Sequence, residues 1–172
     1  PVHPFPNVNE VKLSIPSSAK VFATLDATKG YWQVPLDEES QHLTTFLTPW
    51  GRFCYTRAPM GLSSSGDEYC LRGDRALESI QNKVKVVDDI LLFASTLEEL
   101  KETLKKVFTV CAENKITLSP KKFKIGREVA FVGMRISASG VRADPEKVKA
   151  IAEFPKPGNI TDLRSFFGLV NQ

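Results

Sequence analysis

Residue types that mark several common functional classes are scarce in this 172-residue sequence. Its three cysteines, Cys54, Cys70 and Cys111, are widely separated and form no Cys-x-x-Cys pair, and its only histidines are His3 and His42. These counts argue against a zinc site, a disulfide framework and a histidine-based triad, and they favour reduced thiols in an intracellular setting. No apolar run approaches the roughly 20 residues that a membrane helix needs, so we expect no membrane partner.

Two catalytic motifs are missing as well. There is no G-x-x-x-x-G-K-[ST] segment, which excludes a P-loop NTPase. The serines at 63–65 lack both a G-x-S-x-G context and a suitable histidine, which argues against a serine hydrolase. The sequence opens on Pro1 with no signal-peptide pattern and stops inside an apolar pattern at Gln172. We therefore expect it to be a piece of a longer protein.

Charge is spread unevenly over a net charge of +3. Residues 1–90 carry 9 basic and 11 acidic side chains, net −2, whereas residues 91–172 carry 14 basic and 9 acidic side chains, net +5. A basic half beside an acidic cluster suits a protein that holds a polyanion with one part and a metal with another. Ordinary surface variation produces such a difference too, and charge alone favours that explanation.

Two adjacent carboxylates, Asp88 and Asp89, stand between two apolar runs within residues 85–94. The β-branched and large apolar flanks predict a strand, a turn and a second strand. The pair is poor turn chemistry, because a two-residue hairpin loop favours Asn-Gly or Asp-Gly and because two like charges lie side by side. Either the acids keep an exposed hairpin soluble, or they face a divalent cation.

A third carboxylate occupies a similar place. Residues 20–26 predict a buried strand that ends in Asp26, 62 residues before Asp88. Mg²⁺ prefers oxygen ligands, and two such ions about 4 Å apart serve in-line displacement at phosphorus. A single aspartate at the end of a strand is more often a cap or turn residue, so the two placements favour a metal site without settling it.

The remaining patterns predict helices packed on an antiparallel sheet, which is the α+β class. Ser65 with Glu68 and Thr96 with Glu99 resemble capping boxes. In chain order, we expect a helical turn at 8–13, a turn or short helix at 27–32, a hairpin of 41–48 and 53–57 around the loop 49–52, and a helix at 65–80. An amphipathic helix should follow at 96–113, with a core stripe of Leu97, Leu100, Leu104, Val107, Phe108 and Cys111. After it we expect a basic segment at 115–127, a strand pair at 129–136, a helix starting at Asp144-Pro145-Glu146, and a last helix from Thr161.

Several ordered motifs then resemble one known family. The segments are Leu25–Val34 (LDATKGYWQV), Pro59–Leu62 (PMGL), Val87–Leu91 (VDDIL), Phe131–Gly133 (FVG) and Leu163–Leu169 (LRSFFGL). Together they resemble the reverse transcriptases of Ty3/Gypsy-type LTR retrotransposons over nearly the whole chain. Any one segment alone is a weak signal, whereas several in this order are a strong one.

The resemblance implies a right-hand polymerase palm, with partial fingers and the start of the thumb or connection. On that basis we expect 1–20 to be a partial fingers segment and lead-in, and 21–114 to be the palm with the catalytic carboxylates. Residues 115–143 would end the palm and include the primer-grip strands. Residues 144–172 would begin a truncated thumb or connection.

The resemblance also implies RNA- or DNA-templated DNA synthesis from a primer 3′ end, using dNTPs and two Mg²⁺ ions, with Mn²⁺ as a possible substitute. Motif position implies the role of each residue. Asp26 and Asp88 would be the main metal ligands, with Asp89 as the accessory carboxylate; Tyr31 would be the steric gate against a 2′-hydroxyl, and Met60 and Gly61 would line the dNTP pocket. The primer grip would be Phe131, Val132 and Gly133, the primer end would meet Val86 and Val87, and Lys121 or Lys122 would donate a proton to pyrophosphate. From the residues alone, a packed aromatic is the better reading of Tyr31.

Two departures from the family pattern keep other readings open. Val86 stands where the family usually has Tyr or Phe, and the basic fingers residues that grip the triphosphate are expected upstream of Pro1. One alternative is a catalytically inactive, co-opted or decayed nucleic-acid-binding copy. Another palm polymerase, such as an RNA-dependent RNA polymerase, fits less well because Tyr31 favours deoxynucleotides.

The resemblance extends to the setting of the chain. Expected partners are an RNA or DNA template with its primer, dNTPs, and the protease, RNase H and integrase domains of a pol polyprotein. The expected location is intracellular, in the cytoplasm or in virus-like particles.

Overall fold

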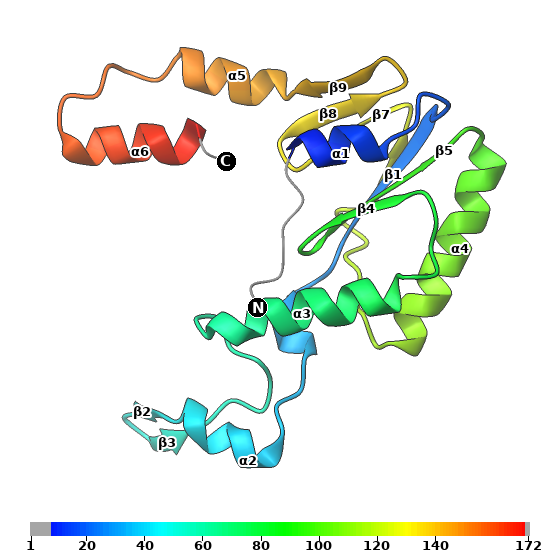
Figure 1. Ribbon diagram of the computed structural model, residues 1–172. Helices are drawn as coiled ribbons and strands as arrows, with labels where there is room; N and C mark the ends of the chain where they lie inside the picture. Colours follow the sequence, from blue (N-terminus) through cyan, green and yellow to red (C-terminus); the bar gives the residue numbers. More distant parts are fainter. Residues whose placement is uncertain (1–7, 171–172) are drawn as a thin grey trace.

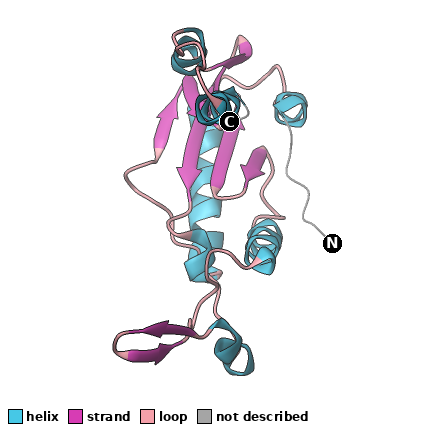
Figure 2. Ribbon diagram, turned by 90° about the vertical axis from the view of Figure 1, so that its left-hand side faces the viewer, coloured by secondary structure: helices cyan, strands magenta, loops and turns pink. Residues whose placement is uncertain are grey.

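The fold is given by a computed structural model that describes residues 8–170. The first seven residues of the expected lead-in (1–20) and the last two of the expected thumb segment lie outside the described residues. Its centre is a four-stranded antiparallel sheet with strand order β4-β5-β1-β6 (Figures 1 and 2). The strands are β1 (Val21–Asp26), β4 (Lys83–Val86), β5 (Asp89–Ala94) and β6 (Lys124–Gly126).

The alternation of side chains along β5 explains why both faces of this sheet are buried. Ile90, Leu92 and Ala94 pack into one apolar cluster, whereas Leu91 and Phe93 pack into another on the opposite face. Successive side chains of a strand point to opposite faces, so a continuous apolar run needs cover on both. The prediction that the strand at 20–26 is buried on both faces is confirmed as well, because Ala23 and Leu25 pack into the first cluster and Phe22 into the second.

Two helices cover the first face: α3 (Ser63–Ala76) and α4 (Leu97–Glu113). The Thr96 side chain caps α4 by accepting a hydrogen bond from the Glu99 amide at 3.2 Å, so this capping prediction is confirmed. Leu100, Leu104, Val107 and Cys111 are buried as predicted. The two other members of the predicted stripe are wrong as core residues, because Leu97 and Phe108 are 41% and 45% exposed.

A second group of elements covers the opposite face. It comprises α1 (Val8–Ser14) and the antiparallel sheet of β7 (Glu128–Phe131), β8 (Met134–Ser137) and β9 (Gly140–Ala143). Ile136 of β8 is fully buried there. The sequence predicted the β7–β8 pair but missed β9, whose short run is mostly exposed and lacks a clear alternating pattern.

Two helices complete the chain, α5 (Pro145–Ala152) and α6 (Ile160–Val170). Asp144 caps α5 by accepting from the Glu146 amide at 3.1 Å, with Pro145 as the first helical residue. This start is the one predicted. The last helix begins one residue before the predicted Thr161. The Asn159 side chain accepts hydrogen bonds from the amides of Thr161 and Asp162 at the start of this helix.

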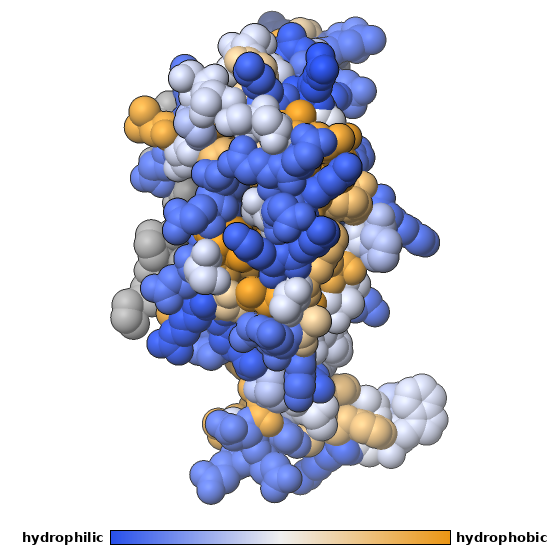
Figure 3. Space-filling model, turned by 90° about the vertical axis from the view of Figure 1, so that its right-hand side faces the viewer, coloured by the Kyte–Doolittle hydropathy of each residue, from blue (hydrophilic) through white to orange (hydrophobic). Residues whose placement is uncertain are grey.

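Residues 35–57 form a projecting arm, closed at its base by a bridge between Pro35 and Arg57. The arm contains α2 (Glu38–Gln41), the 3₁₀ turn η2 (His42–Thr44), β2 (Phe46–Thr48) and β3 (Gly51–Phe53). It stands apart from the larger sheet in Figures 2 and 3. The predicted hairpin is therefore shorter than expected: 41–44 are helical, and only Pro49 and Trp50 separate the strands.

The start of α3 also differs from prediction. The helix begins at Ser63, Leu62 is its cap residue, and no side chain caps it. Ser65, predicted as the cap, lies inside the first turn, where its hydroxyl donates to the Pro59 carbonyl at 2.9 Å. The helix ends at Ala76 rather than 80. Within residues 8–170, none of the helices combines the length and apolar character of a membrane span.

Candidate functional site

The pairing of β1 with β5 brings the predicted acidic residues together. Asp26, the last residue of β1, lies opposite Asp89, the first residue of β5. The amide of Ala27 then donates to the carbonyl of Asp88 at 2.9 Å. Residues 62 positions apart in the chain thus meet at one sheet end, which is the geometry that the sequence predicted.

The β4–β5 turn is displaced by one residue from the prediction. Because Val86 pairs with Asp89, the two turn residues are Val87 and Asp88 rather than the two aspartates. Val87 takes a left-handed backbone with φ 54°. This conformation is an outlier for a β-branched residue and is typical of strain held at functional sites.

Burial and mutual repulsion both act on the acidic pair. Burial, and next the nearby Asp26 carboxylate, raise the pKa of Asp88, and the same two causes in the same order raise the pKa of Asp89. Lys122 opposes both effects. Groups of like charge at one site disfavour their charged forms, so this end of the sheet favours any added cation.

One lysine already supplies part of that positive charge. The Lys122 ammonium donates to Asp26 Oδ2 at 2.6 Å, and this hydrogen bond is the main cause that raises the pKa of Lys122. The sequence left open whether Lys121 or Lys122 donates a proton to pyrophosphate, and of these two lysines Lys122 is the one that contacts Asp26. Sequence distance hid it, because 96 positions separate the two partners.

The donor set suits a hard divalent cation, since all three groups are carboxylates. Within the described part of the chain, however, no three or more His, Cys, Asp or Glu side chains are grouped so as to hold a metal ion. Asp26 is bound to Lys122, and Asp88 and Asp26 line different pockets. The residues thus fit in kind and in backbone placement, while their side chains do not converge as they stand.

Asp26 and Asp89 open onto a groove shared with the β7–β8 turn. Lys121, Lys122 and Lys124 form its basic side, and Phe131 and Val132 its apolar side. The turn has positive φ at Val132 (45°) and Gly133 (72°), as a type I′ hairpin requires. Two of the three predicted primer-grip residues, Phe131 and Val132, thus border the same groove as two of the acids, whereas Gly133 lines a different pocket. Phe131 is itself buried in the core.

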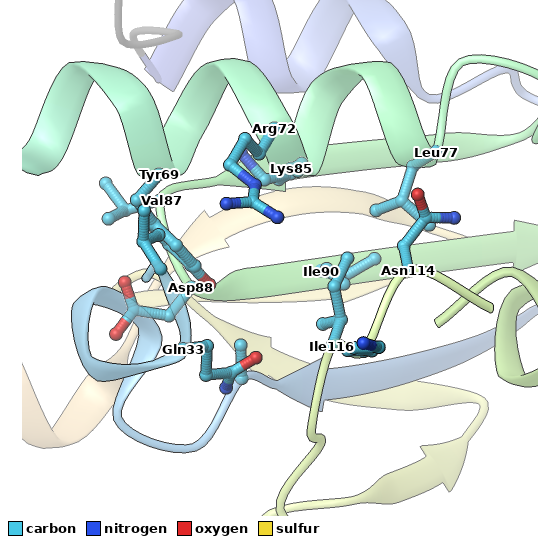
Figure 4. A pocket seen from close by; sticks show the side chains of 14 residues that line it. Gln33, Tyr69, Arg72, Leu77, Lys85, Val87, Asp88, Ile90, Asn114 and Ile116 are labelled. Atoms are coloured by element: carbon cyan, nitrogen blue, oxygen red, sulfur yellow. The ribbon is translucent and has the colours of Figure 1, made fainter. Parts of the chain in front are cut away.

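Asp88 faces a second pocket, between α3, the β4–β5 hairpin and residues 114–116. Figure 4 shows Tyr69, Val87 and Asp88 gathered at one end, with Arg72 and Lys85 on the side of α3. Lys85 is 8% exposed and forms an ion pair with Asp74 at 2.9 Å. Tyr69 and Lys85 were not predicted from the sequence, although a lysine three positions before Asp88 in an apolar strand was a visible signal.

The predicted nucleotide-pocket residues are only partly gathered. Tyr31 lies in the 3₁₀ helix η1 (Gly30–Gln33) and packs edge-on against Tyr69, with ring centroids 5.6 Å apart. Burial, and next the Asp88 carboxylate, raise the pKa of Tyr31. Met60 is 70% exposed, Gly61 adopts φ 102°, and neither lines the two pockets described above.

Comparison with known proteins gives one consistent result. Residues 4–136 match the family model described as reverse transcriptase (RNA-dependent DNA polymerase). Two Drosophila melanogaster sequences are similar: the retrovirus-related Pol polyprotein from transposon 297 (33% identical over 97% of this chain and 16% of the relative) and that from transposon gypsy (30% identical over 98% and 16%). These matches confirm the resemblance that the sequence motifs suggested.

A solved structure of similar fold is a foamy viral protease–reverse transcriptase in complex with an RNA/DNA hybrid. Its TM-score is 0.83 at 29% sequence identity, over 88% of this chain and 21% of that chain. The predicted palm architecture is thereby confirmed. The chain spans about a sixth of the length of the two transposon polyproteins that it matches.

Proposed function

The chain belongs to the reverse transcriptase (RNA-dependent DNA polymerase) family, and from that premise we propose that it carries the polymerase centre of a retrotransposon Pol protein. The proposed reaction is template-directed nucleotidyl transfer. The primer 3′-oxygen bonds to the α-phosphorus of a dNTP, the bond to the bridging oxygen breaks, and pyrophosphate leaves. The observation that carries the proposal is the meeting of Asp26, Asp88 and Asp89 at one sheet end.

Asp26 and Asp88 are proposed as the main ligands of a divalent metal pair, with Asp89 as the accessory carboxylate. Reverse transcriptases as a class depend on divalent metal, and Mg²⁺, with Mn²⁺ as a substitute, is the proposed ion. When bound, the pair would activate the primer hydroxyl and offset charge on the leaving pyrophosphate. The raised pKa values of Asp88 and Asp89 support this role, because repulsion among unneutralised carboxylates is relieved by a cation.

Lys122 has two proposed roles at the same place. Before a cation binds, its ammonium neutralises Asp26 across the 2.6 Å contact. Once the carboxylates hold metal, the ammonium is free to turn toward the groove and hold a proton for the leaving pyrophosphate. Its exposed side chain supports this movement, since the lysine stem is not packed in the core.

The groove with Phe131, Val132 and Gly133 is the proposed seat of the primer end, with Val86 and Val87 contacting it from the catalytic hairpin. The lysines of the groove suit the phosphate backbone. An RNA or DNA template with its primer is the proposed partner, in keeping with the RNA/DNA hybrid held by the foamy viral relative. Tyr31, Met60 and Gly61 are proposed to contact the dNTP, with Tyr31 excluding a 2′-hydroxyl.

The larger assembly is proposed on the same basis. Protease, RNase H and integrase domains would accompany this chain in a Pol polyprotein, in the cytoplasm or in virus-like particles. The proposed division of the chain is partial fingers and lead-in at 1–20, palm at 21–114, end of the palm with the primer-grip strands at 115–143, and start of thumb or connection at 144–172. An inactive copy is not favoured, because all three carboxylates are present; Val86 is the one residue that speaks for it.

Primer extension on an RNA template tests the proposal. The natural protein that contains this chain should extend a DNA primer with dNTPs in Mg²⁺, and Asp26→Asn and Asp88→Asn should each abolish extension. Asp37→Asn is the matched control, because this exposed aspartate precedes α2 with no side-chain capping bond. Full extension by Asp26→Asn would show the assignment to be wrong.

A second measurement does not depend on activity. Mg²⁺ should raise the thermal midpoint of the wild-type chain, because a ligand that binds only the folded state stabilises it. The shift should disappear in Asp26→Asn and persist in Asp37→Asn. Equal shifts in all three proteins would place the binding elsewhere.

A further inference from the structure

The Tyr31 ring rests on a buried side chain of helix α3. Tyr69 is 6% exposed, and its ring lies edge-on to Tyr31 with an interplanar angle of 85° and a centroid distance of 5.6 Å. Such edge-to-face pairs contribute roughly 0.5–1.5 kcal/mol beyond the area that they bury. The contact therefore selects one orientation of Tyr31 rather than merely filling space.

The Tyr69 ring also packs closely against the backbone of Gly30, the residue before Tyr31. A Cβ atom added at Gly30 would lie 2.5 Å from Cζ of Tyr69 and under 3.0 Å from both of its Cε atoms. These atoms belong to a rigid ring in a packed interior, so they have little room to move. Gly30 thus admits Tyr69 to a position in which it touches two consecutive residues of η1.

The turn of α3 before Tyr69 also lies near Tyr31. A Cβ atom added at Gly66 would lie 3.6 Å from the Tyr31 hydroxyl oxygen. Gly66 and Tyr69 are three positions apart, so they share one face of the helix. The phenol of Tyr31 therefore lies along this helix face, with its ring against Tyr69 and its hydroxyl end beside Gly66, which has no side chain to crowd it.

The far side of Tyr69 faces the catalytic hairpin. The Lys85 ammonium lies 5.9 Å from the Tyr69 ring centroid, a cation–π distance, and it is fixed by its ion pair with Asp74. Gly73 gives it room, because a Cβ atom there would lie 2.7 Å from Lys85 Cε. Tyr69 thus stands between the Tyr31 ring and the strand that leads to Asp88.

We propose that Tyr69 is a positioning residue that sets the sugar selectivity of the nucleotide site by holding Tyr31 in place. The inference rests on the proposed function, in which Tyr31 is the steric gate. A gate rejects a 2′-hydroxyl only while its ring is held within a fraction of an ångström, and a side chain keeps such a position when its neighbours leave it no alternative. Truncating Tyr69 opens space beside Gly30 into which Tyr31 can turn.

Single-nucleotide incorporation by Tyr69→Leu is the direct test. The ratio of kcat/KM for a dNTP to that for the matching rNTP should fall by about 10-fold or more, in line with the loss of one packing contact around a discriminated group. The fall should come mainly from faster rNTP use. Tyr69→Phe is the matched control, because it keeps the ring that makes the three contacts, and it should retain the wild-type ratio.

Gly30→Ala gives a second, independent perturbation of the same contact. The added methyl displaces the Tyr69 ring from the other side, so selectivity should fall here too. In the double variant Gly30→Ala/Tyr69→Leu the clash is removed, and the two effects on the ratio should be smaller than their product, as expected for residues in direct contact. Thermal melting of each variant identifies those that fold.

The outcomes separate this inference from the proposal beneath it. A purely structural role for Tyr69 would lower dNTP and rNTP use by the same factor, and an unchanged ratio in folded Tyr69→Leu and Gly30→Ala would overturn the inference. Loss of selectivity in Tyr69→Phe would overturn it as well, because the hydroxyl rather than the ring would then be responsible. A wild-type protein that never extends a primer would instead contradict the proposed function.

Discussion

Two hairpins of this chain solve the same turn problem differently. The β4–β5 hairpin closes through Val87 and Asp88, and the β7–β8 hairpin closes through Val132 and Gly133. Each places a valine at positive φ, 54° and 45° respectively, where β-branched residues are rare. In the second turn a glycine takes the other left-handed position (φ 72°), as expected for a type I′ turn. In the first turn Val87 alone departs from ordinary backbone.

The difference teaches where the fold tolerates backbone strain. Val87 is half-buried and packs against the apolar cluster around Tyr69 and Cys70, so its environment holds the unfavourable conformation in place. Val132 is 38% exposed and depends on its glycine neighbour. The strained turn that presents the carboxylates is therefore supported by tertiary packing, while the β7–β8 turn is supported by local turn chemistry.

The largest expected change in stability comes from truncating side chains in the apolar core that supports both hairpins. Leu92→Ala and Ile136→Ala each remove a fully buried side chain, and each should lower the free energy of unfolding by roughly 2–5 kcal/mol. Urea unfolding measures this loss. Leu47→Ala in the arm, where the side chain is 78% exposed, should change stability by less than about 0.5 kcal/mol. A small cost for Ile136→Ala alone would separate β7–β9 from the common core.

The next effect concerns the glycine that only one turn has. Gly133→Ala should cost roughly 1–2 kcal/mol, because alanine resists the left-handed backbone. Its Cβ would also clash with the Lys147 ammonium, although a flexible lysine end can move away. Gly168→Ala in α6 should have the opposite sign, since nothing lies within 4 Å of an added Cβ there and alanine favours helix. Thermal melts of both variants decide the matter.

Replacing both valines by asparagine sharpens the comparison. Asparagine tolerates the left-handed region, and Val132→Asn creates an Asn-Gly turn, so it should raise the free energy of unfolding by about 1 kcal/mol. Val87→Asn should gain less, because it loses apolar packing against the Tyr69 cluster. Chemical denaturation of the two single variants gives the difference. An equal gain in both would mean that packing does not support the β4–β5 turn.

The smallest effect concerns charge at the catalytic turn without divalent metal. The pKa values of Asp88 and Asp89 are raised in the folded protein, so the folded state binds protons more tightly than the unfolded state. Their contribution to stability is then favourable below the unfolded pKa and is lost as pH rises through the raised folded pKa. At neutral pH Asp88→Asn should be neutral or slightly stabilising.

Thermal melts in EDTA measure this contribution. They should cover about pH 4 to 8, because carboxylates ionise near the lower end of that range. The wild-type midpoint should fall relative to Asp88→Asn as pH rises, and Mg²⁺ should reverse the order of the two proteins. A clear loss of stability in metal-free Asp88→Asn would reveal a structural partner of Asp88.

The element types were largely readable from local patterns. The apolar runs before Asp26 and after Asp89 predicted buried strands, and Thr96 and Asp144 predicted helix starts that the hydrogen bonds confirm. The failures share a cause. The 41–44 segment, the Ser65 cap and β9 have weak or ambiguous local signals, and hydrogen bonds to other residues accompany the observed structure, as in the pairing of β9 with β8. Ser65, for example, is drawn into the helix by the Pro59 carbonyl.

The candidate site divides in the same way. Its three carboxylates were found because their motifs are local, and Tyr31 because it lies near Asp26 in sequence. The ion pair between Asp26 and Lys122 was not predicted, because 96 positions of sequence separate the two residues. Tyr69 and Lys85 carry no motif, and their roles depend on two glycines that admit them.

By itself, the order of residues determined that this chain is α+β, that its acids stand at strand ends, and which family it resembles, because these properties reside in short runs of the chain. Only the tertiary structure decided that the turn is Val87-Asp88, that Lys122 neutralises Asp26, and that Tyr69 fits between Gly30 and Lys85. Strand register and close packing bring together groups far apart in sequence, and no local pattern encodes those distances.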